Sequence, residues 1–190
     1  MTRFRHLRDS DVHLGHIWKV VIAEFESPSG ESFHRDIVRS PGSVGVVPLV
    51  FDAEGLASVV LVRQYRPPYG RDLIEIPAGM CDVPGEPTAE TGRRELIEEA
   101  GLAAGEMVHL LDMLPAPGMT DSVCSIFLAT DCTGVDHDRH GPEEQEMEIL
   151  HLPLDDALAM IDRGEICDAK TVVGLLATDR RLRLESSASG

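Results

Sequence analysis

The chain has 190 residues, of which 17 are Lys or Arg and 33 are Asp or Glu, so its formal net charge at pH 7 is −16. This length suits one domain with at most a small addition, and 43% hydrophobic residues can build an ordinary globular core. The negative charge argues against nucleic-acid binding, because phosphate contacts need clustered basic residues, and against docking on anionic membranes.

The cysteines and the N-terminus indicate a cytoplasmic protein. No apolar run follows the first residues, so no signal peptide is predicted, and no stretch approaches the roughly 18 apolar residues of a membrane span. The four cysteines are far apart and form no CxxC pair, which is typical of reduced, incidental thiols rather than of disulfides or a zinc site.

The first half of the sequence predicts two β-hairpins and a short strand. Residues 17–25 are rich in β-branched side chains, a Ser-Pro-Ser-Gly turn follows, and residues 32–38 can continue as the second strand. Residues 44–51 and 58–65 predict another hairpin around an Asp-Ala-Glu-Gly turn. Residues 72–76 form a short strand that ends at a proline.

The second half begins with a helix. Pro87 suits its first turn and Gly101 suits its end. Small and apolar residues recur between them at helical spacing, namely Ala89, Gly92, Leu96 and Ala100. The remaining predicted elements are strands at 107–114 and 123–130, a polar loop at 131–142, a strand at 148–152, and helices at 155–163 and 170–181.

This order of elements lacks the regular strand–helix alternation of a doubly wound fold and favours an α+β fold. We expect residues 1–42 to form a small N-terminal antiparallel β unit and residues 43–184 to form the main domain. Residues 185–190 are expected to be a frayed tail.

The predicted helix places three carboxylates on one face. Glu95 and Glu99 lie four positions apart, about 40° of rotation, and Glu98 lies about 60° to the other side. Clustered like charges destabilise a helix, and Mg²⁺ or Mn²⁺ would offset this, because hard divalent cations prefer carboxylate oxygens. Spacing alone leaves a second interpretation open, a solvent-exposed face with Arg93 and Arg94 as ion-pair partners.

A longer pattern favours the metal site. Residues 79–102 resemble the Nudix hydrolase signature, which consists of a Gly, a Glu and then Arg-Glu-apolar-x-Glu-Glu-x-Gly-apolar. Seven residues separate Glu86 from Arg94, as in the family, whereas six residues instead of five separate Gly79 from Glu86. The matching positions are Gly79, Glu86, Arg94, Glu95, Leu96, Glu98, Glu99, Gly101 and Leu102.

The resemblance implies a fold, a reaction and roles for these positions. The fold would be an α/β/α sandwich, and the reaction would be metal-dependent hydrolysis of a nucleoside diphosphate linked to another group. Glu95, Glu99 and the carbonyl of Ala78 would bind the metal. Arg94 would hold the glutamates in place, and Glu98 would bind the metal or act beside it. The positions that shape the motif would be Gly79, Glu86 and Gly101.

The flanking sequences resemble the ADP-ribose pyrophosphatase branch of this family. The similarity lies in VRQYR at 62–66, EIPAG at 75–79 and PAPGMT at 115–120. It implies Mg²⁺-dependent cleavage of ADP-ribose to AMP and ribose 5-phosphate, and a homodimer formed through the N-terminal β unit. In this branch the base that activates water comes from the loop before the last strand, where the sequence has Glu143, Glu144, Glu146 and Glu148. Glu143 and Glu144 are favoured because they lie deepest in the loop, and a solvent-exposed charge is the alternative for each of the four.

Substrate contacts are expected from outside the helix. Arg63 and Arg66 are candidates for the diphosphate, although two residues three apart on a strand face opposite sides. Trp18 and Phe25 are candidates for stacking on adenine, with packing in the core as the alternative for both. The proline-glycine element adds Pro117 and Gly118.

Two alternative functions remain open. The substrate could be another nucleoside diphosphate sugar, such as GDP-mannose, or the chain could be a non-catalytic Nudix module that binds ADP-ribose. The complete carboxylate set argues against the module. The charge of −16 is compatible with a diphosphate substrate, because bound cations reverse the local sign at a carboxylate cluster.

Overall fold

The computed structural model describes residues 3–51, 55–137 and 145–188. The chain forms two compact units, and each is described by itself. Unit 1 consists of Met1–Gly42 together with Leu114–Val123, and unit 2 consists of Ser43–Met113 together with Cys124–Gly190. Residues 114–123, which we expected within the main domain, thus belong to the N-terminal unit.

Unit 1 contains a three-stranded antiparallel sheet of β1 (Arg5–Leu14), β2 (Lys19–Glu26) and β3 (Ser32–Arg39), in that order. β2 and β3 confirm the predicted N-terminal hairpin. β1 was not predicted, because nine of its ten residues are exposed and no alternation of apolar side chains marks it. The central strand buries Val21 and Ala23.

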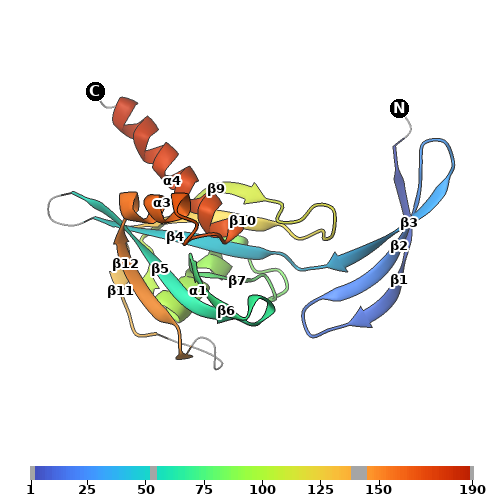
Figure 1. Cartoon of the computed structure of the whole chain (residues 1–190), viewed down its shortest axis with the longest axis horizontal. Helices are drawn as coiled ribbons and strands as arrows, with labels where there is room; N and C mark the ends of the chain where they lie inside the picture. The colour runs from blue at the N-terminus through green and yellow to red at the C-terminus, as the bar shows by residue number, and fades with distance from the viewer. Residues whose placement is uncertain (1–2, 52–54, 138–144, 189–190) are drawn as a thin grey trace. The chain divides into compact units, whose positions relative to one another are not determined.

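Unit 2 is built on a seven-stranded mixed sheet (Figure 1). Its strands are β4 (Ser43–Phe51), β5 (Ala57–Arg66), β6 (Arg71–Glu75), β7 (Ala78–Met80), β9 (Glu106–Met113), β10 (Cys124–Thr130) and β12 (Glu148–Pro153). The main path runs β12-β5-β4-β10-β9, with β6 paired to β5 and β7 paired to β4. β10 is parallel to β4, and the other pairings are antiparallel.

Six of these seven strands confirm predicted strands to within one residue at each end. The exception is β7, which is too short to carry a periodic pattern. A 3₁₀ turn, η1 (Pro67–Tyr69), links β5 to β6. The segment expected as a polar loop from residue 131 contains β11 (Thr133–Gly134), which pairs with β8 (Leu102–Ala103).

The described part of unit 2 contains the helices α1 (Thr88–Ala100), α3 (Leu154–Asp162) and α4 (Ala169–Ala188), which confirm the three predicted helices. α4 is longer than predicted, so the expectation of a frayed tail is wrong up to Ala188. The last turns are stabilised by a hydrogen bond from Ser186 Oγ to the carbonyl of Leu182, 2.9 Å long, and by an Arg181–Glu185 ion pair of 2.9 Å.

The helices lie on both faces of the sheet, which confirms the α/β/α sandwich (Figure 1). Successive side chains of β4 point to opposite faces of the sheet, and both faces are covered by helices. Val44 and Val46 pack into one buried cluster with Leu96 of α1. Val47 and Leu49 point the other way and pack into a second cluster with residues of α3 and α4.

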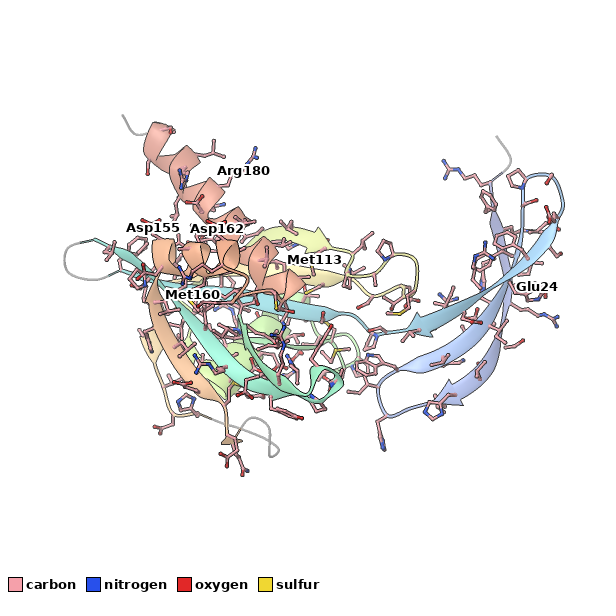
Figure 2. All side chains as sticks on the ribbon, in the orientation of Figure 1. Glu24, Met113, Asp155, Met160, Asp162 and Arg180 are labelled. Carbon is pink, nitrogen blue, oxygen red and sulfur yellow. The ribbon has the colours of Figure 1, made fainter. Side chains whose placement is uncertain are left out.

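The helices on the second face are amphipathic. On α3, Asp155 and Asp162 are exposed while Met160 packs against the core, and on α4 Arg180 is exposed (Figure 2). Within the described residues, no helix combines the length and the apolar character needed to cross a membrane.

Candidate active site

The site is organised around α1, whose C-terminal end and inner face are set by glycines. Gly101 ends the helix with a φ of +62°, and its N–H donates to the carbonyl of Ile97 at 3.0 Å. Gly92, an unusual residue inside a helix, faces the sheet. A Cβ atom there would lie 3.1 Å from a methyl carbon of Val46, so glycine lets α1 pack closely against β4.

Glu95 and Glu99 lie one turn apart on α1, and both are nearly buried, with 8% and 4% of their surface exposed. The backbone N–H of Ala78 donates to Oε2 of Glu99 at 2.8 Å. A Cβ atom on Gly79 would lie 2.0 Å from Cδ of Glu95. β7 therefore forms a wall against both carboxylates, and its glycine leaves the room that Glu95 needs.

The electrostatics of this pair favour a bound cation. Burial raises the pKa of Glu99 from 4.5 to about 8; the hydrogen bond from Ala78 opposes the rise, and the charge of Glu95 adds to it. A nearby positive charge stabilises the ionised form of such buried carboxylates.

Arg94 lies among four carboxylates. Its Nη1 donates to Oε1 of Glu95 at 2.8 Å and lies 3.3 Å from Oε2 of Glu98. Its Nη2 lies 3.5 Å from Oε2 of Glu86 and 3.7 Å from Oδ1 of Asp82. Arg94 thus holds Glu95 and Glu98 and ties α1 to the loop that precedes it.

Glu86 anchors that loop to the helix. Its Oε2 accepts a hydrogen bond of 2.7 Å from the hydroxyl of Thr91. The loop forms a turn in which the N–H of Glu86 donates to the carbonyl of Val83 at 3.2 Å and Gly85 has a φ of +82°. The additional residue between Gly79 and Glu86 therefore does not keep Glu86 from reaching α1.

The donor set suits a cation that needs few protein ligands. Within the described residues, no three His, Cys, Asp or Glu side chains are arranged to hold a metal ion. Two carboxylates are, however, a set that Mg²⁺ accepts, because it keeps several waters and binds proteins through one or two carboxylates. Glu95, Glu99 and the backbone of Ala78 fit that requirement.

The two candidate arginines on β5 have different surroundings. Arg63 is exposed and forms an ion pair of 3.0 Å with Glu148, which lies opposite it on β12. Arg66 is half-buried, and its Nε and Nη2 donate to the two carboxylate oxygens of Glu75, each at 2.6 Å. Glu75 is the main cause of the raised pKa of Arg66, and the charge of Glu99 contributes. The negative charge of the carboxylate site therefore acts on the guanidinium of Arg66.

A buried ion network behind Arg66 was not predicted. Glu75 is 1% exposed and contacts Lys170 as well as Arg66. Lys170 Nζ donates to Asp168 at 2.9 Å, and Asp168 accepts the backbone N–H of Thr171 at 3.0 Å, which caps α4. The N-cap spacing of Asp168 and Thr171 was a usable signal, but Glu75 and Lys170 are 95 positions apart.

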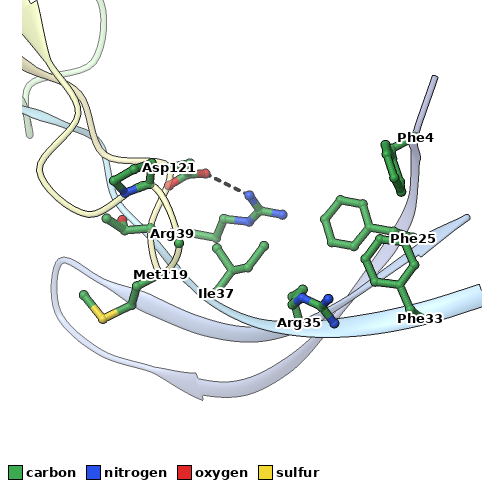
Figure 3. Close-up of a pocket in the computed structure, with 11 residues that line it drawn as sticks. Phe4, Phe25, Phe33, Arg35, Ile37, Arg39, Met119 and Asp121 are labelled. Atoms are coloured by element: carbon green, nitrogen blue, oxygen red, sulfur yellow. Dashed lines mark hydrogen bonds and ion pairs between the residues drawn. The ribbon is translucent and has the colours of Figure 1, made fainter. Parts of the chain in front are cut away.

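Unit 1 has its own pocket, with a volume of about 460 Å³ (Figure 3). The rings of Phe25 and Phe33 stack in its wall with centroids 5.5 Å apart, and the guanidinium of Arg35 lies 4.8 Å from the centroid of Phe33. Pro117 and Gly118 also line it. Aromatic faces and a guanidinium are groups on which a flat heterocycle can stack.

The remaining candidates lie elsewhere. Trp18 is 55% exposed and does not line the pocket of unit 1, so the structure brings Phe25, Pro117 and Gly118 together without Trp18. Glu143 and Glu144, the candidate bases, lie outside the described residues.

Comparisons with known proteins point to one family. The family model of the NUDIX domain matches residues 40–172. The chain is 35% identical over 174 residues to the ADP-ribose pyrophosphatase of Mycobacterium tuberculosis, covering 92% of this chain and 82% of the relative. It is 30% identical over 161 residues to the ADP-ribose pyrophosphatase of Bacillus subtilis, covering 85% and 84%. A solved structure of an ADP compounds hydrolase shares the fold, with a TM-score of 0.82, 22% identity and 97% of both chains covered.

Proposed function

The chain belongs to the Nudix family, and from this premise we propose that it hydrolyses the diphosphate bond of ADP-ribose to AMP and ribose 5-phosphate. The observation that carries the proposal is the buried pair of Glu95 and Glu99 against the wall of β7. A module that only bound ADP-ribose would have no use for two buried carboxylates. The names of the two relatives support the choice of substrate.

Different residues of the chain bind the metal and contact the diphosphate. Glu95, Glu99 and the carbonyl of Ala78 would hold Mg²⁺, with Mn²⁺ as the alternative, and the cation would neutralise the diphosphate and orient the leaving phosphate. Arg94 keeps Glu95 in place through its hydrogen bond of 2.8 Å. Arg66 presents its guanidinium to the diphosphate, whereas Arg63, exposed and paired with Glu148, has the weaker claim.

The reaction also needs a base. Water attacks one phosphorus, its proton passes to a carboxylate, and the bond from that phosphorus to the leaving oxygen breaks. We assign the base to Glu143 or Glu144, which precede β12 in the sequence. Separate Glu143→Gln and Glu144→Gln variants test the assignment. The variant that lacks the base should have a kcat at least about 100-fold lower than the wild type and should still bind substrate in the presence of Mg²⁺.

We assign nucleobase binding and dimer formation to unit 1. The pocket with Phe25, Phe33 and Arg35 offers stacking surfaces for an adenine ring. Light scattering combined with gel filtration should give twice the monomer mass, and a dilute, fully active monomer would contradict the dimer. Phe33→Ala should weaken binding of AMP at least about five-fold, since stacking on an aromatic side chain contributes about 1–3 kcal/mol.

The compartment follows from the thiols. All four cysteines are free, including the exposed Cys167. Unpaired thiols suit a reducing compartment, so we propose a cytoplasmic enzyme. Fractionation of cells that express the tagged chain would reveal any other location.

A substrate panel tests the proposed function directly. The purified chain is incubated with ADP-ribose, GDP-mannose, NADH or a diadenosine polyphosphate, with Mg²⁺ or with EDTA, and the products are identified. We expect ADP-ribose to give the highest kcat/KM, with AMP and ribose 5-phosphate as products and no turnover in EDTA. Preference for GDP-mannose would favour the alternative enzyme, and binding of ADP-ribose without turnover would favour a non-catalytic module.

A further inference from the structure

The network behind Arg66 contains a cation that has no role in the proposed mechanism. Lys170 is one of two lysines in the chain, its side chain is 14% exposed, and its Nζ contacts Glu75 and Asp168. We propose that Lys170 is a positioning residue for diphosphate recognition: it fixes Glu75, and Glu75 fixes the guanidinium of Arg66. The inference rests on the proposed function, in which Arg66 contacts the diphosphate.

The pairing of Arg66 with Glu75 determines which part of the guanidinium a substrate can use. Glu75 takes the side edge, since it accepts from Nε and Nη2 at 2.6 Å each. Two N–H groups on Nη1 and one on Nη2 are not engaged by this bidentate pairing. The Arg66 side chain is 35% exposed and that of Glu75 is 1% exposed. The N–H groups on the outer edge of Arg66 are therefore the ones that Glu75 leaves for a substrate, and the plane of the Glu75 carboxylate sets their direction.

Lys170 is the contact that locks this carboxylate. Oε2 of Glu75 accepts from Lys170 Nζ as well as from Arg66, whereas Oε1 accepts from Arg66. Asp168 holds Lys170 in turn, at 2.9 Å, and is itself fixed as the cap of α4. A continuous series of charged hydrogen bonds thus joins the beginning of α4 to Arg66.

The charges of the network explain why a cation is needed there. Glu75 and Asp168 supply two negative charges and Arg66 and Lys170 supply two positive charges, so the cluster is neutral. Removal of Lys170 leaves the negative charges in excess and removes one of the two donors to Oε2 of Glu75, so that Arg66 alone holds the carboxylate. Arg66 would then follow Glu75 or turn toward Asp168, and its outer edge would no longer point in one direction.

If Lys170 positions Arg66, its loss should raise KM and leave kcat almost unchanged. A contact with the non-reacting oxygens of the diphosphate is made in the ground state as well as in the transition state, so its loss raises KM and changes kcat little. Lys170→Met should raise KM for ADP-ribose roughly ten-fold and leave kcat within about two-fold. Lys170→Arg, which retains the cation, should recover most of that loss. The matched control is Arg183→Met, which removes an exposed cation paired with Asp179 on the same helix and should leave KM unchanged.

A double-mutant cycle with Arg66→Gln tests whether Lys170 acts through Arg66. If it does, Lys170→Met should change KM by less than about two-fold in the Arg66→Gln background, because contacting residues of one network are not additive. An equal rise in both backgrounds, or a lower melting temperature with an unchanged KM, would overturn the inference. If the wild-type chain cleaves no diphosphate in the panel, the proposed function fails and the inference fails with it; cleavage with an unaltered KM in Lys170→Met defeats the inference alone.

Discussion

A Cβ atom at Gly79 would lie 2.0 Å from Cδ of Glu95 and 2.1 Å from its Oε1. Real Cβ atoms do not come this close to other heavy atoms, so any side chain at position 79 would force the Glu95 carboxylate out of its present place against β7. Gly79 and Glu95 are therefore one steric unit, although 15 residues separate them in the sequence.

Gly79→Ala should displace the Glu95 carboxylate and lower kcat/KM for the preferred diphosphate at least about 100-fold, since small misplacements of a catalytic group have effects of this size. The control is Gly134→Ala, because a Cβ atom there meets nothing within 4 Å and φ is not positive. Kinetics and far-UV circular dichroism measure the outcome. A fully active, well-folded Gly79→Ala enzyme would mean that Glu95 is not required at this place.

Glu99→Gln tests the second carboxylate. A glutamine can still accept the N–H of Ala78, which donates to Glu99 at 2.8 Å, but it carries no charge for a cation. Mg²⁺-dependent cleavage should fall at least about 100-fold. Burial raises the pKa of Glu99 to about 8, so at pH 7 without metal the carboxyl is mostly protonated and uncharged. Replacing it with the neutral glutamine should therefore not lower the melting temperature of the metal-free protein.

The control for Glu99→Gln lies on the same helix. Glu90 is exposed near the beginning of α1, 3.7 Å from Arg93, and its exchange for Gln should leave activity unchanged. Retained turnover in Glu99→Gln, or an equal loss in Glu90→Gln, would contradict the assignment of Glu99.

The Glu75 network predicts a pH dependence of stability. Burial opposes ionisation of Glu75, but the hydrogen bonds and charges of Arg66 and Lys170 outweigh it and hold the pKa below 4.5. A carboxyl whose pKa is lower in the folded state stabilises that state above its unfolded pKa, and the contribution is lost as the pH falls through the folded value.

Glu75→Gln should therefore be less stable than the wild type at pH 7, by roughly 3 kcal/mol, because it leaves the half-buried Arg66 and the mostly buried Lys170 short of a charged partner. The difference in the free energy of unfolding should narrow as the pH falls from the ordinary carboxyl pKa of 4.5 through the lower folded value, where the wild-type carboxyl also becomes protonated. Urea unfolding of the wild type and of Glu75→Gln at pH 7, 5 and 3.5 measures this difference. A difference that stays constant over this range would mean that the charge of Glu75 is not what stabilises the network.

The elements that could be predicted are those whose side chains are buried with a regular period. α1 shows this, since its small and apolar positions recur at helical spacing and face the sheet. The motif also pointed to the carboxylates that the structure places against β7, because Glu95 and Glu99 are local to one helix. Six of the seven strands in the main sheet of unit 2 were predicted to within one residue at each end, since their buried runs end at Gly, Pro or Asp turns.

What could not be predicted depends on contacts between distant segments. β1 is held by pairing with β2 rather than by burial, so its sequence has no alternating pattern. The Glu75–Lys170 contact joins a strand end to a helix beginning that is far away in the sequence. The same holds for residues 114–123, which pair with β3 through the N–H of Val38 and the carbonyl of Met119, 2.9 Å apart.

Arg39 is the side chain that holds this segment on the sheet of unit 1. Its Nε and Nη2 donate to Asp9 of β1 at 3.0 and 2.9 Å, and its Nη1 donates to Asp121 at 3.0 Å. One guanidinium thus joins β3 to β1 and to residues 114–123, and it is only 28% exposed. Such a charge-assisted, partly buried network contributes more than a surface ion pair.

Arg39→Met should lower the free energy of unfolding by about 1–3 kcal/mol and should speed amide hydrogen exchange in residues 114–123 before it affects unit 2. Arg5→Met is the matched control, because Arg5 forms an exposed ion pair of 3.1 Å with Glu26 in the same sheet and should contribute less than about 1 kcal/mol. Exchange measured by mass spectrometry resolves the two units. Equal protection of residues 114–123 in both variants would mean that the backbone pairing with Val38 is sufficient without Arg39.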